Sequence, residues 1–175
     1  EKHPPFLTMA LGAGAVTPLQ MASGYGVFAN GGYLVAPRLI ERITDYRGRV
    51  LQDSPTQRPD ESMRVIDARN AYVMTDLLQE VTRSGTAARA QGTLKRNDIY
   101  GKTGTTNDSL DAWFAGWHPS LVAVVWIGYD TPRKLGDKET GGGLALPVWI
   151  EYMQFALKAL PPQKSAAKAP EGLIN

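Results

Sequence analysis

Three strand-like runs follow one another closely in the second half of the chain, and they limit its fold more than any other feature. They span Ile99 to Thr105, Ala112 to His118 and Leu121 to Tyr129, and the second and third are rich in aromatic and β-branched residues. The segments between them are too short for the crossovers that parallel strands require. The sequence therefore predicts an antiparallel meander with the first run as an edge strand.

Helical patterns flank this meander in the sequence. The predicted helices begin at Thr17, where a capping box is possible, at Asp67 and near Leu146. Their expected buried side chains are Met21, Tyr25 and Phe28, then Ala71, Met74, Leu78 and Val81, then Trp149, Ile150, Met153 and Leu157. A β-hairpin is expected from Tyr33 to Gln52, and a surface loop from Asp53 to Asp60. These elements predict an α+β fold, with helices covering an antiparallel sheet.

The first strand of the meander carries Lys102-Thr103-Gly104-Thr105, which places a cation, two hydroxyls and a glycine in a row. Alternation along a strand sends Lys102 and Gly104 to one face and Thr103 and Thr105 to the other. Because Gly104 has no Cβ, the backbone of a ligand can come close to the strand, and a free edge can hold an extended peptide as an added strand. We therefore expect one wall of a site for an anionic, peptide-like substrate.

Composition excludes several other classes of function. The net charge of +2, with no cluster of basic residues, argues against nucleic acid as a partner. The longest apolar stretch, Leu121 to Ile127, is far shorter than a membrane span. The sequence contains no cysteine, which excludes disulfides and thiolate metal sites. The opening residues, Glu1 to Pro5, do not resemble a signal peptide.

Four segments resemble the transpeptidase domain of class A, or bifunctional, penicillin-binding proteins. Lys102 to Asp130 contains the Lys-Thr-Gly motif, and the other three are Ala10 to Ala22, Val81 to Ala87 and Thr140 to Trp149. The resemblance runs in register from about Leu7 to about Leu160. It implies the transpeptidase fold that these proteins share with serine β-lactamases, of which this chain would hold the C-terminal half.

The same resemblance implies a division of the chain. Residues 1–160 correspond to the C-terminal portion of the transpeptidase domain, and residues 161–175 form a tail rich in Pro, Ala and Lys that we expect to be flexible. In the family's five-stranded sheet, the strand matching Leu121 to Tyr129 also pairs with an amino-terminal strand that this chain does not contain. We therefore expect the upstream half of the domain, in the same or a separate chain, to complete the fold.

Roles for individual residues follow from the resemblance alone. The ammonium of Lys102 is expected beside the nucleophile, where it assists proton transfer. Thr103 and Thr105 are expected to hydrogen-bond the substrate carboxylate, and the backbone N–H of Thr105 to supply half of the oxyanion hole. Gly104 and Thr106 are expected to line the substrate-binding site.

Two further motifs of the family are not found ahead of Lys102. The family attacks D-alanyl-D-alanine with the serine of a Ser-x-x-Lys motif, assisted by a Ser-x-Asn motif, and Lys-Thr-Gly comes third. A literal Ser165-Ala-Ala-Lys168 occurs, but it follows Lys-Thr-Gly and lies in the Pro- and Ala-rich tail. We therefore expect the nucleophilic serine to lie outside this chain.

The implied function is that of a peptidoglycan D,D-transpeptidase, a penicillin-sensitive acyltransferase that cross-links stem peptides. Serine, lysine and backbone donors supply its chemistry, so no metal ion and no organic cofactor is expected. The expected partners are stem peptides and β-lactams. The parent protein would be anchored through a segment outside this chain, at the periplasmic face of the bacterial inner membrane.

The sequence offers three alternatives to this function. A non-catalytic module could bind peptide or peptidoglycan through the same strand, and a serine β-lactamase-type hydrolase shares the Lys-Thr-Gly motif and the fold. A phosphate-binding loop at Gly101-Lys102-Thr103 would need a glycine where Arg96 stands, and a helix where the sequence is strand-like. The segments Ala10 to Ala22 and Thr140 to Trp149 favour the transpeptidase.

The remaining conspicuous residues have structural interpretations. The aromatic residues of the meander are expected in the core, namely Trp113, Phe114, Trp117 and Trp126. Both histidines, His3 and His118, precede a proline and are expected at the surface or in a turn. The acidic and amide residues Asn107, Asp108 and Asp111 are expected to form turns rather than a cation site. The run Gly141 to Gly143 is expected to be a flexible turn leading into the last helix.

Overall fold

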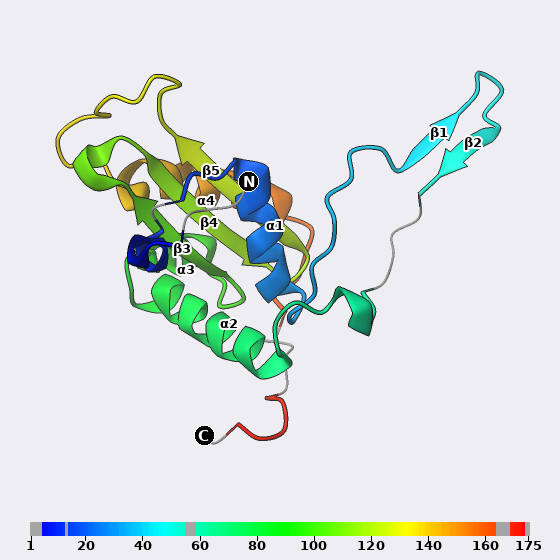
Figure 1. The fold of residues 1–175 in the computed structure, drawn as a ribbon, viewed down its shortest axis with the longest axis horizontal. Helices are drawn as coiled ribbons and strands as arrows, with labels where there is room; N and C mark the ends of the chain where they lie inside the picture. Colours follow the sequence, from blue (N-terminus) through cyan, green and yellow to red (C-terminus); the bar gives the residue numbers. More distant parts are fainter. Residues whose placement is uncertain (1–4, 13, 55–58, 164–168, 174–175) are drawn as a thin grey trace.

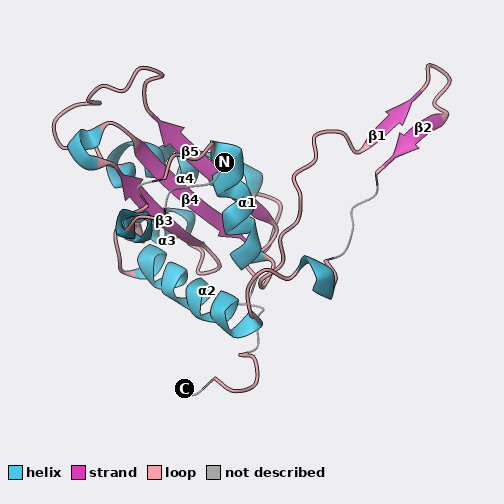
Figure 2. Cartoon of the chain, in the orientation of Figure 1, coloured by secondary structure: helices cyan, strands magenta, loops and turns pink. Residues whose placement is uncertain are grey.

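The computed structural model describes residues 5–12, 14–54, 59–163 and 169–173. Its centre is a three-stranded antiparallel sheet in the order β3-β4-β5, made of Tyr100–Thr105, Ala112–His118 and Leu121–Ile127. Helices lie on both sides of this sheet (Figure 2). The fold is therefore α+β, and the predicted meander with β3 at its edge is confirmed.

One face of the sheet packs against α4, Leu146–Ala156, and α3, Ala88–Leu94. Phe114 and Trp149 meet edge to face, with ring centroids 4.9 Å apart. The core on this face also holds Ile99, Met153, Leu146, Ile150 and Leu157, all of them buried. The amphipathic pattern of the last helix thus predicted its buried face.

The other face is covered at one end by α1, Pro18–Ala29, and by α2, Ala68–Arg83. The Trp117 ring stacks on Tyr100 and contacts the rings of Tyr25 and Phe28 from α1. Both helices begin where local capping chemistry predicts. Thr17 and Gln20 form the capping box, and Asp67 accepts a hydrogen bond from the backbone N–H of Arg69.

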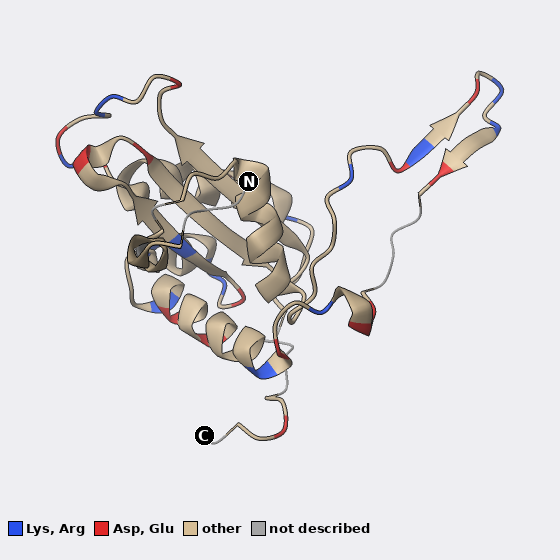
Figure 3. Cartoon of the chain, viewed as in Figure 1, with Lys and Arg blue, Asp and Glu red and all other residues tan. Residues whose placement is uncertain are grey.

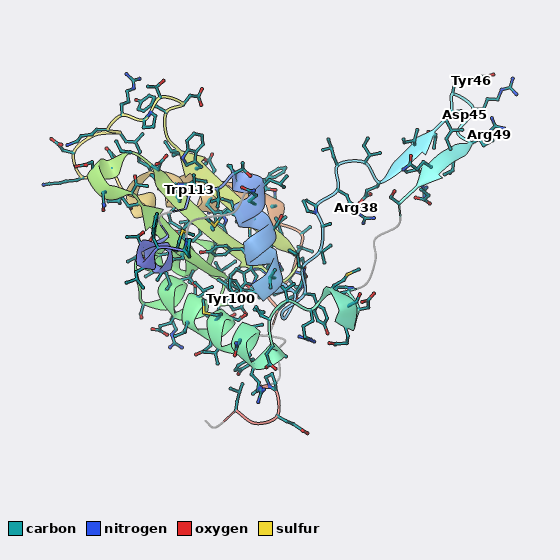
Figure 4. All side chains as sticks on the ribbon, in the orientation of Figure 1. Arg38, Asp45, Tyr46, Arg49, Tyr100 and Trp113 are labelled. Carbon is teal, nitrogen blue, oxygen red and sulfur yellow. The ribbon has the colours of Figure 1, made fainter. Side chains whose placement is uncertain are left out.

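A β-hairpin stands away from the body of the molecule (Figure 1). Its strands are β1, Arg42–Thr44, and β2, Val50–Asp53, so the predicted hairpin exists but is shorter than Tyr33 to Gln52. Every residue of both strands is exposed. Asp45 accepts two backbone hydrogen bonds that close the turn, and Tyr46 is at its tip (Figure 4). Ahead of β1, Tyr33 forms only a single bridge, to Arg64.

Two short helical elements differ from the expectation. The sequence did not predict α3, because its N-cap residue Ala87 has no capping side chain and Gly92 lies within it. The glycine run forms a turn of π-helix, η4, at Gly141–Ala145, that leads directly into α4. The described residues also form three turns of 3-10 helix, η1 at Leu7–Leu11, η2 at Glu61–Met63 and η3 at Asn107–Ser109.

His118 is buried, which shows that the expectation of a surface or turn position for this residue was wrong. Its side chain is fully inaccessible and lies 3.2 Å from the carboxylate of Asp98, which is also fully buried. Arg96 donates two hydrogen bonds to that carboxylate and two more to the carbonyls of Leu160 and Pro161. Pro119 follows the end of β4, but the imidazole itself lies in a buried cluster with Asp98 and Arg96.

The C-terminal residues return to the same cluster. The backbone N–H of Gln163 donates to Asp98 at 2.6 Å. The predicted tail boundary at residue 160 stays a prediction, and Ser165 to Lys168, like His3, lie outside the described residues. None of the helices in the described part of the chain is long and apolar enough to cross a membrane. Lys and Arg are scattered over the molecule instead of gathering on one face (Figure 3).

Candidate active site

Strand β3 places Lys102, Thr103, Gly104 and Thr105 along a free edge of the sheet. It pairs with β4 on one side, and no described strand pairs with its other side. The register sets Lys102 opposite Ala115 and Gly104 opposite Trp113. Unpaired backbone donors and acceptors on such an edge can bind an extended peptide.

An open cavity of about 670 Å³ adjoins this edge. It lies between β3, the start of α1 with the residues that precede it, and the uncovered end of one sheet face. Met21 and Tyr25 of α1 line it, as do Trp113 and Trp126 of the sheet. Lys102, Thr103, Gly104, Thr105 and Thr106 line it as well, so the structure brings all five predicted site residues to one place.

Lys102 is exposed, and its contacts leave its charge uncompensated. Its ammonium donates to the backbone carbonyl of Thr103 at 2.9 Å and to the Thr103 hydroxyl at 3.4 Å. Within the described part of the chain, no carboxylate lies within salt-bridge distance of Lys102. A cation held by neutral oxygens beside a cavity can attract an anionic group there.

The two threonine hydroxyls of β3 have fixed neighbours. The Thr103 hydroxyl lies 2.9 Å from that of Thr86, which follows α2. The Thr105 hydroxyl accepts a hydrogen bond of 3.0 Å from the backbone N–H of Gly141. The sequence did not indicate Thr86 or Gly141 as residues of the site, although both lie in segments that carry the family resemblance.

Gly141 fits against β3 because it has no side chain. A Cβ at this position would lie 2.3 Å from the Trp113 carbonyl oxygen and 2.4 Å from that of Gly104. Gly141 is therefore packed tightly against the site, whereas a Cβ on Gly142 or Gly143 would make only ordinary contacts. The run forms the expected turn into the last helix, and its flexibility stays a prediction. Gly104 is also close to its neighbour, since an added Cβ would lie 3.1 Å from the Cβ of Trp113.

Thr106 and the turn that follows it close the connection between β3 and β4. The Thr106 hydroxyl accepts from the backbone N–H of Asp111 at 2.8 Å, and Asp111 accepts from the indole N–H of Trp126 at 2.8 Å. Asn107 and Asp108 lie in the single 3-10 turn between the strands. These contacts confirm that this acidic segment forms a turn.

Only some of the aromatic residues of the meander are in the core. Phe114 and Trp117 are buried as predicted. Trp126 is 37% exposed and Trp113 is half-buried, so the core assignment was wrong for this pair. The register pairs Trp113 with Trp126 on the sheet face that α1 leaves uncovered at this end, and there both rings line the cavity.

Comparison with known proteins gives a consistent result over most of the chain. The family model for the penicillin-binding protein transpeptidase domain matches residues 5–154. A penicillin-binding protein 1A from Neisseria flavescens is 51% identical over 98% of this chain, and one from Pseudomonas aeruginosa is 40% identical over 100% of it. The chain covers 21% and 26% of those two relatives, or about a fifth to a quarter of their length.

Solved structures agree with this similarity. The crystal structure of penicillin-binding protein 1A from Haemophilus influenzae superposes with a TM-score of 0.83 at 35% identity, covering 91% of this chain and 29% of that one. The penicillin-binding protein PonA1 from Mycobacterium tuberculosis superposes with a TM-score of 0.78 at 27% identity, covering 98% of this chain and 48% of that one. The chain therefore belongs to the penicillin-binding protein transpeptidase domain family.

Proposed function

We propose that the protein carrying this chain is a peptidoglycan D,D-transpeptidase, which cross-links stem peptides by acyl transfer. The observation that best supports this function is the position of Lys102 to Thr105 on a free strand edge beside a cavity. Such an edge can hold an extended peptide while the cation and hydroxyls bind its terminal carboxylate. Membership of the family supplies the reaction class.

Each residue of the edge has a role in this proposal. Lys102 helps to move the proton of the reacting serine and favours the substrate carboxylate electrostatically. The hydroxyls of Thr103 and Thr105 hydrogen-bond that carboxylate. The backbone N–H of Thr105 stabilises the oxyanion of the tetrahedral intermediate, and one such donor is worth about 3 kcal/mol of barrier. Gly104 allows the peptide to approach, and Thr106 borders the site.

The reaction proceeds by two acyl transfers. A serine outside this chain attacks the D-alanyl-D-alanine peptide bond, the terminal D-alanine leaves, and a serine ester forms. An amine of a neighbouring stem peptide then attacks the ester, forms the new amide and releases the serine. The groups that carry these steps are serine, lysine and backbone donors, so the mechanism requires neither a metal ion nor an organic cofactor.

The proposal includes the partners and location of the whole protein. Its ligands are stem peptides and β-lactams, and the related PonA1 protein has been solved in complex with penicillin V. The upstream half of the domain supplies the serine and completes the fold. An anchor outside this chain holds the protein at the periplasmic face of the inner membrane.

Covalent labelling with a fluorescent penicillin tests the acyl transfer. The full-length protein should label stoichiometrically, and the label should map to a serine outside residues 1–175. Residues 1–175 alone should not label. Labelling of the isolated chain at any serine, Ser165 included, would overturn the assignment. Rapid turnover of the label, with release of hydrolysed penicillin, would instead indicate the β-lactamase-type alternative, and no labelling would indicate a binding module.

Substitutions on β3 test the proposed roles in the full-length protein. Lys102→Ala should slow acylation by orders of magnitude because the lysine takes part in proton transfer. Thr103→Ala or Thr105→Ala should each slow it about 10- to 150-fold, since each removes one of several hydrogen bonds to a charged group. Lys158→Ala, at an exposed position beyond the end of α4, is the matched control and should react normally. Wild-type acylation rates in Lys102→Ala would refute the catalytic role.

A further inference from the structure

Thr86 lies next to the proposed site without lining its cavity. It follows the end of α2 in the segment Ser84 to Ala87, and its hydroxyl is 2.9 Å from that of Thr103. The turn that carries it is tightly packed, because a Cβ on Gly85 would lie 2.8 Å from the Cα of Val81. The backbone N–H of Ala87 bonds to the Val81 carbonyl on the other side of Thr86. The position of Thr86 relative to β3 is therefore fixed by its neighbours.

The hydrogen bonds of Thr103 determine where its proton can point. A hydroxyl has one proton to donate and can accept two hydrogen bonds. The Lys102 ammonium can only donate, so it occupies one acceptor position of the Thr103 oxygen. If the Thr86 hydroxyl donates as well, both acceptor positions are filled and the proton of Thr103 remains for a ligand. If Thr103 donated to Thr86 instead, it would have no proton left for an anion.

Thr105 shows the same arrangement with a different donor. Its hydroxyl accepts from the backbone N–H of Gly141, and a peptide N–H cannot accept a hydrogen bond. The proton of Thr105 is consequently free for a ligand. Each threonine hydroxyl of β3 thus has a neighbour that can donate a hydrogen bond to it. For Thr103 this neighbour is the Thr86 hydroxyl, and for Thr105 it is the backbone N–H of Gly141.

We propose that Thr86 is a positioning residue, which donates its hydroxyl proton to Thr103 and so directs the Thr103 proton toward the carboxylate of the bound peptide or β-lactam. The inference rests on the proposed transpeptidase function. A bound carboxylate accepts hydrogen bonds only, so its arrival selects the arrangement in which Thr86 is the donor. Thr86 does not contact the substrate in this proposal and acts only through Thr103.

A purely structural role for the Thr86 hydroxyl fits the structure less well. Thr86 is exposed, and its side chain shares a hydrogen bond with another hydroxyl at the site, that of Thr103. Replacing an exposed hydroxyl by a methyl group of the same shape usually changes folding stability little. The effect of losing it should therefore appear in acylation and not in unfolding.

The test measures penicillin acylation rates and thermal unfolding of the full-length protein. Thr86→Val keeps the shape and removes the hydroxyl, and it should slow acylation about 3- to 10-fold, the effect of one neutral hydrogen bond. Thr86→Ser restores the hydroxyl and should restore most of the rate. Thr93→Val, at an exposed position of α3, is the matched control and should react like the wild type. All three variants should unfold at the wild-type temperature.

A double-mutant cycle separates positioning from other effects. If Thr86 acts only through Thr103, adding Thr86→Val to Thr103→Ala should cause no further loss. Additive losses, or a wild-type rate in Thr86→Val, would overturn the inference while the acylation of the wild type still supports the proposed function. Absence of acylation in the wild-type protein would refute the proposed function itself.

Discussion

At the scale of single residues, the buried cluster of Arg96, Asp98 and His118 links residues 160–163 to the sheet. Ser120 donates its backbone N–H to His118 Nδ1, and Nε2 lies 3.2 Å from the carboxylate of Asp98. Burial lowers the pKa of His118, and the guanidinium of Arg96, 2.9 Å away, adds to this effect, whereas Asp98 opposes it. Burial alone would raise the pKa of Asp98, but hydrogen bonds from Arg96 and from the N–H of Gln163 lower it.

This cluster predicts a loss of stability in mild acid. Because the pKa of His118 is lowered in the folded protein, the folded state binds this proton at a lower pH than the unfolded chain, which binds it below the ordinary pKa of 6.5. The contribution of His118 to the free energy of unfolding should be constant above pH 6.5. Below that pH the free energy of unfolding should decrease, by at most about 1.4 kcal/mol per pH unit from this group. Asp98 adds a further loss in stronger acid, as the pH falls below its ordinary value.

Urea unfolding of the protein at pH 7.5, 6.5 and 5.5 measures this dependence. His118→Gln retains an amide donor near Asp98 and removes the titration, so its stability should change less between pH 6.5 and 5.5 than that of the wild type. Equal slopes in the two proteins would contradict the assignment. An NMR titration that shows His118 protonated at pH 6.5 in the folded state would contradict it directly.

At the scale of elements, the close packing of η4 against β3 at the site depends on the absence of a side chain at Gly141. Gly141→Ala would bring a Cβ within 2.4 Å of two backbone oxygens, one from β3 and one from β4. We expect a loss of about 1–3 kcal/mol of stability as the backbone shifts. Gly143→Ala is the control within the same run, since its Cβ would lie 3.4 Å from the Thr140 hydroxyl. Urea unfolding of both variants checks this, and equal stabilities would show that η4 is not tightly packed.

The elements that the sequence predicts well are those that local chemistry determines. Thr17 and Asp67 cap their helices through side chains only a few residues away, so α1 and α2 begin where expected. The elements that were missed depend on distant contacts. The η4 turn follows from the packing of Gly141 on β3 and β4, and α3 begins at Ala88 after an N-cap residue, Ala87, that has no capping side chain.

At the scale of the whole molecule, the site also combines features that the local sequence determines with features that depend on distant contacts. The alternation of β3 and its position at the sheet edge were predictable, because strand order follows from short connections. The partners of its hydroxyls, Thr86 and Gly141, come from other elements and were not predicted. The burial of His118 and the exposure of Trp126 likewise depend on which elements cover each end of the sheet, and sequence periodicity carries no information about that.

The free edge of β5 leads to a prediction about the complete protein. This strand pairs with β4 alone among the described strands, and Trp126 on it is 37% exposed. An unpaired edge with half-buried valines is prone to pair with another chain, so in the full-length protein we expect a further strand from outside this chain to cover it. Hydrogen exchange should then be slow for every amide of Leu121–Ile127, as for β4, and fast in the following loop at residues 131–138. If the amides of β5 that do not pair with β4 exchange as fast as that loop, the edge is open to solvent and the expected five-stranded sheet is wrong.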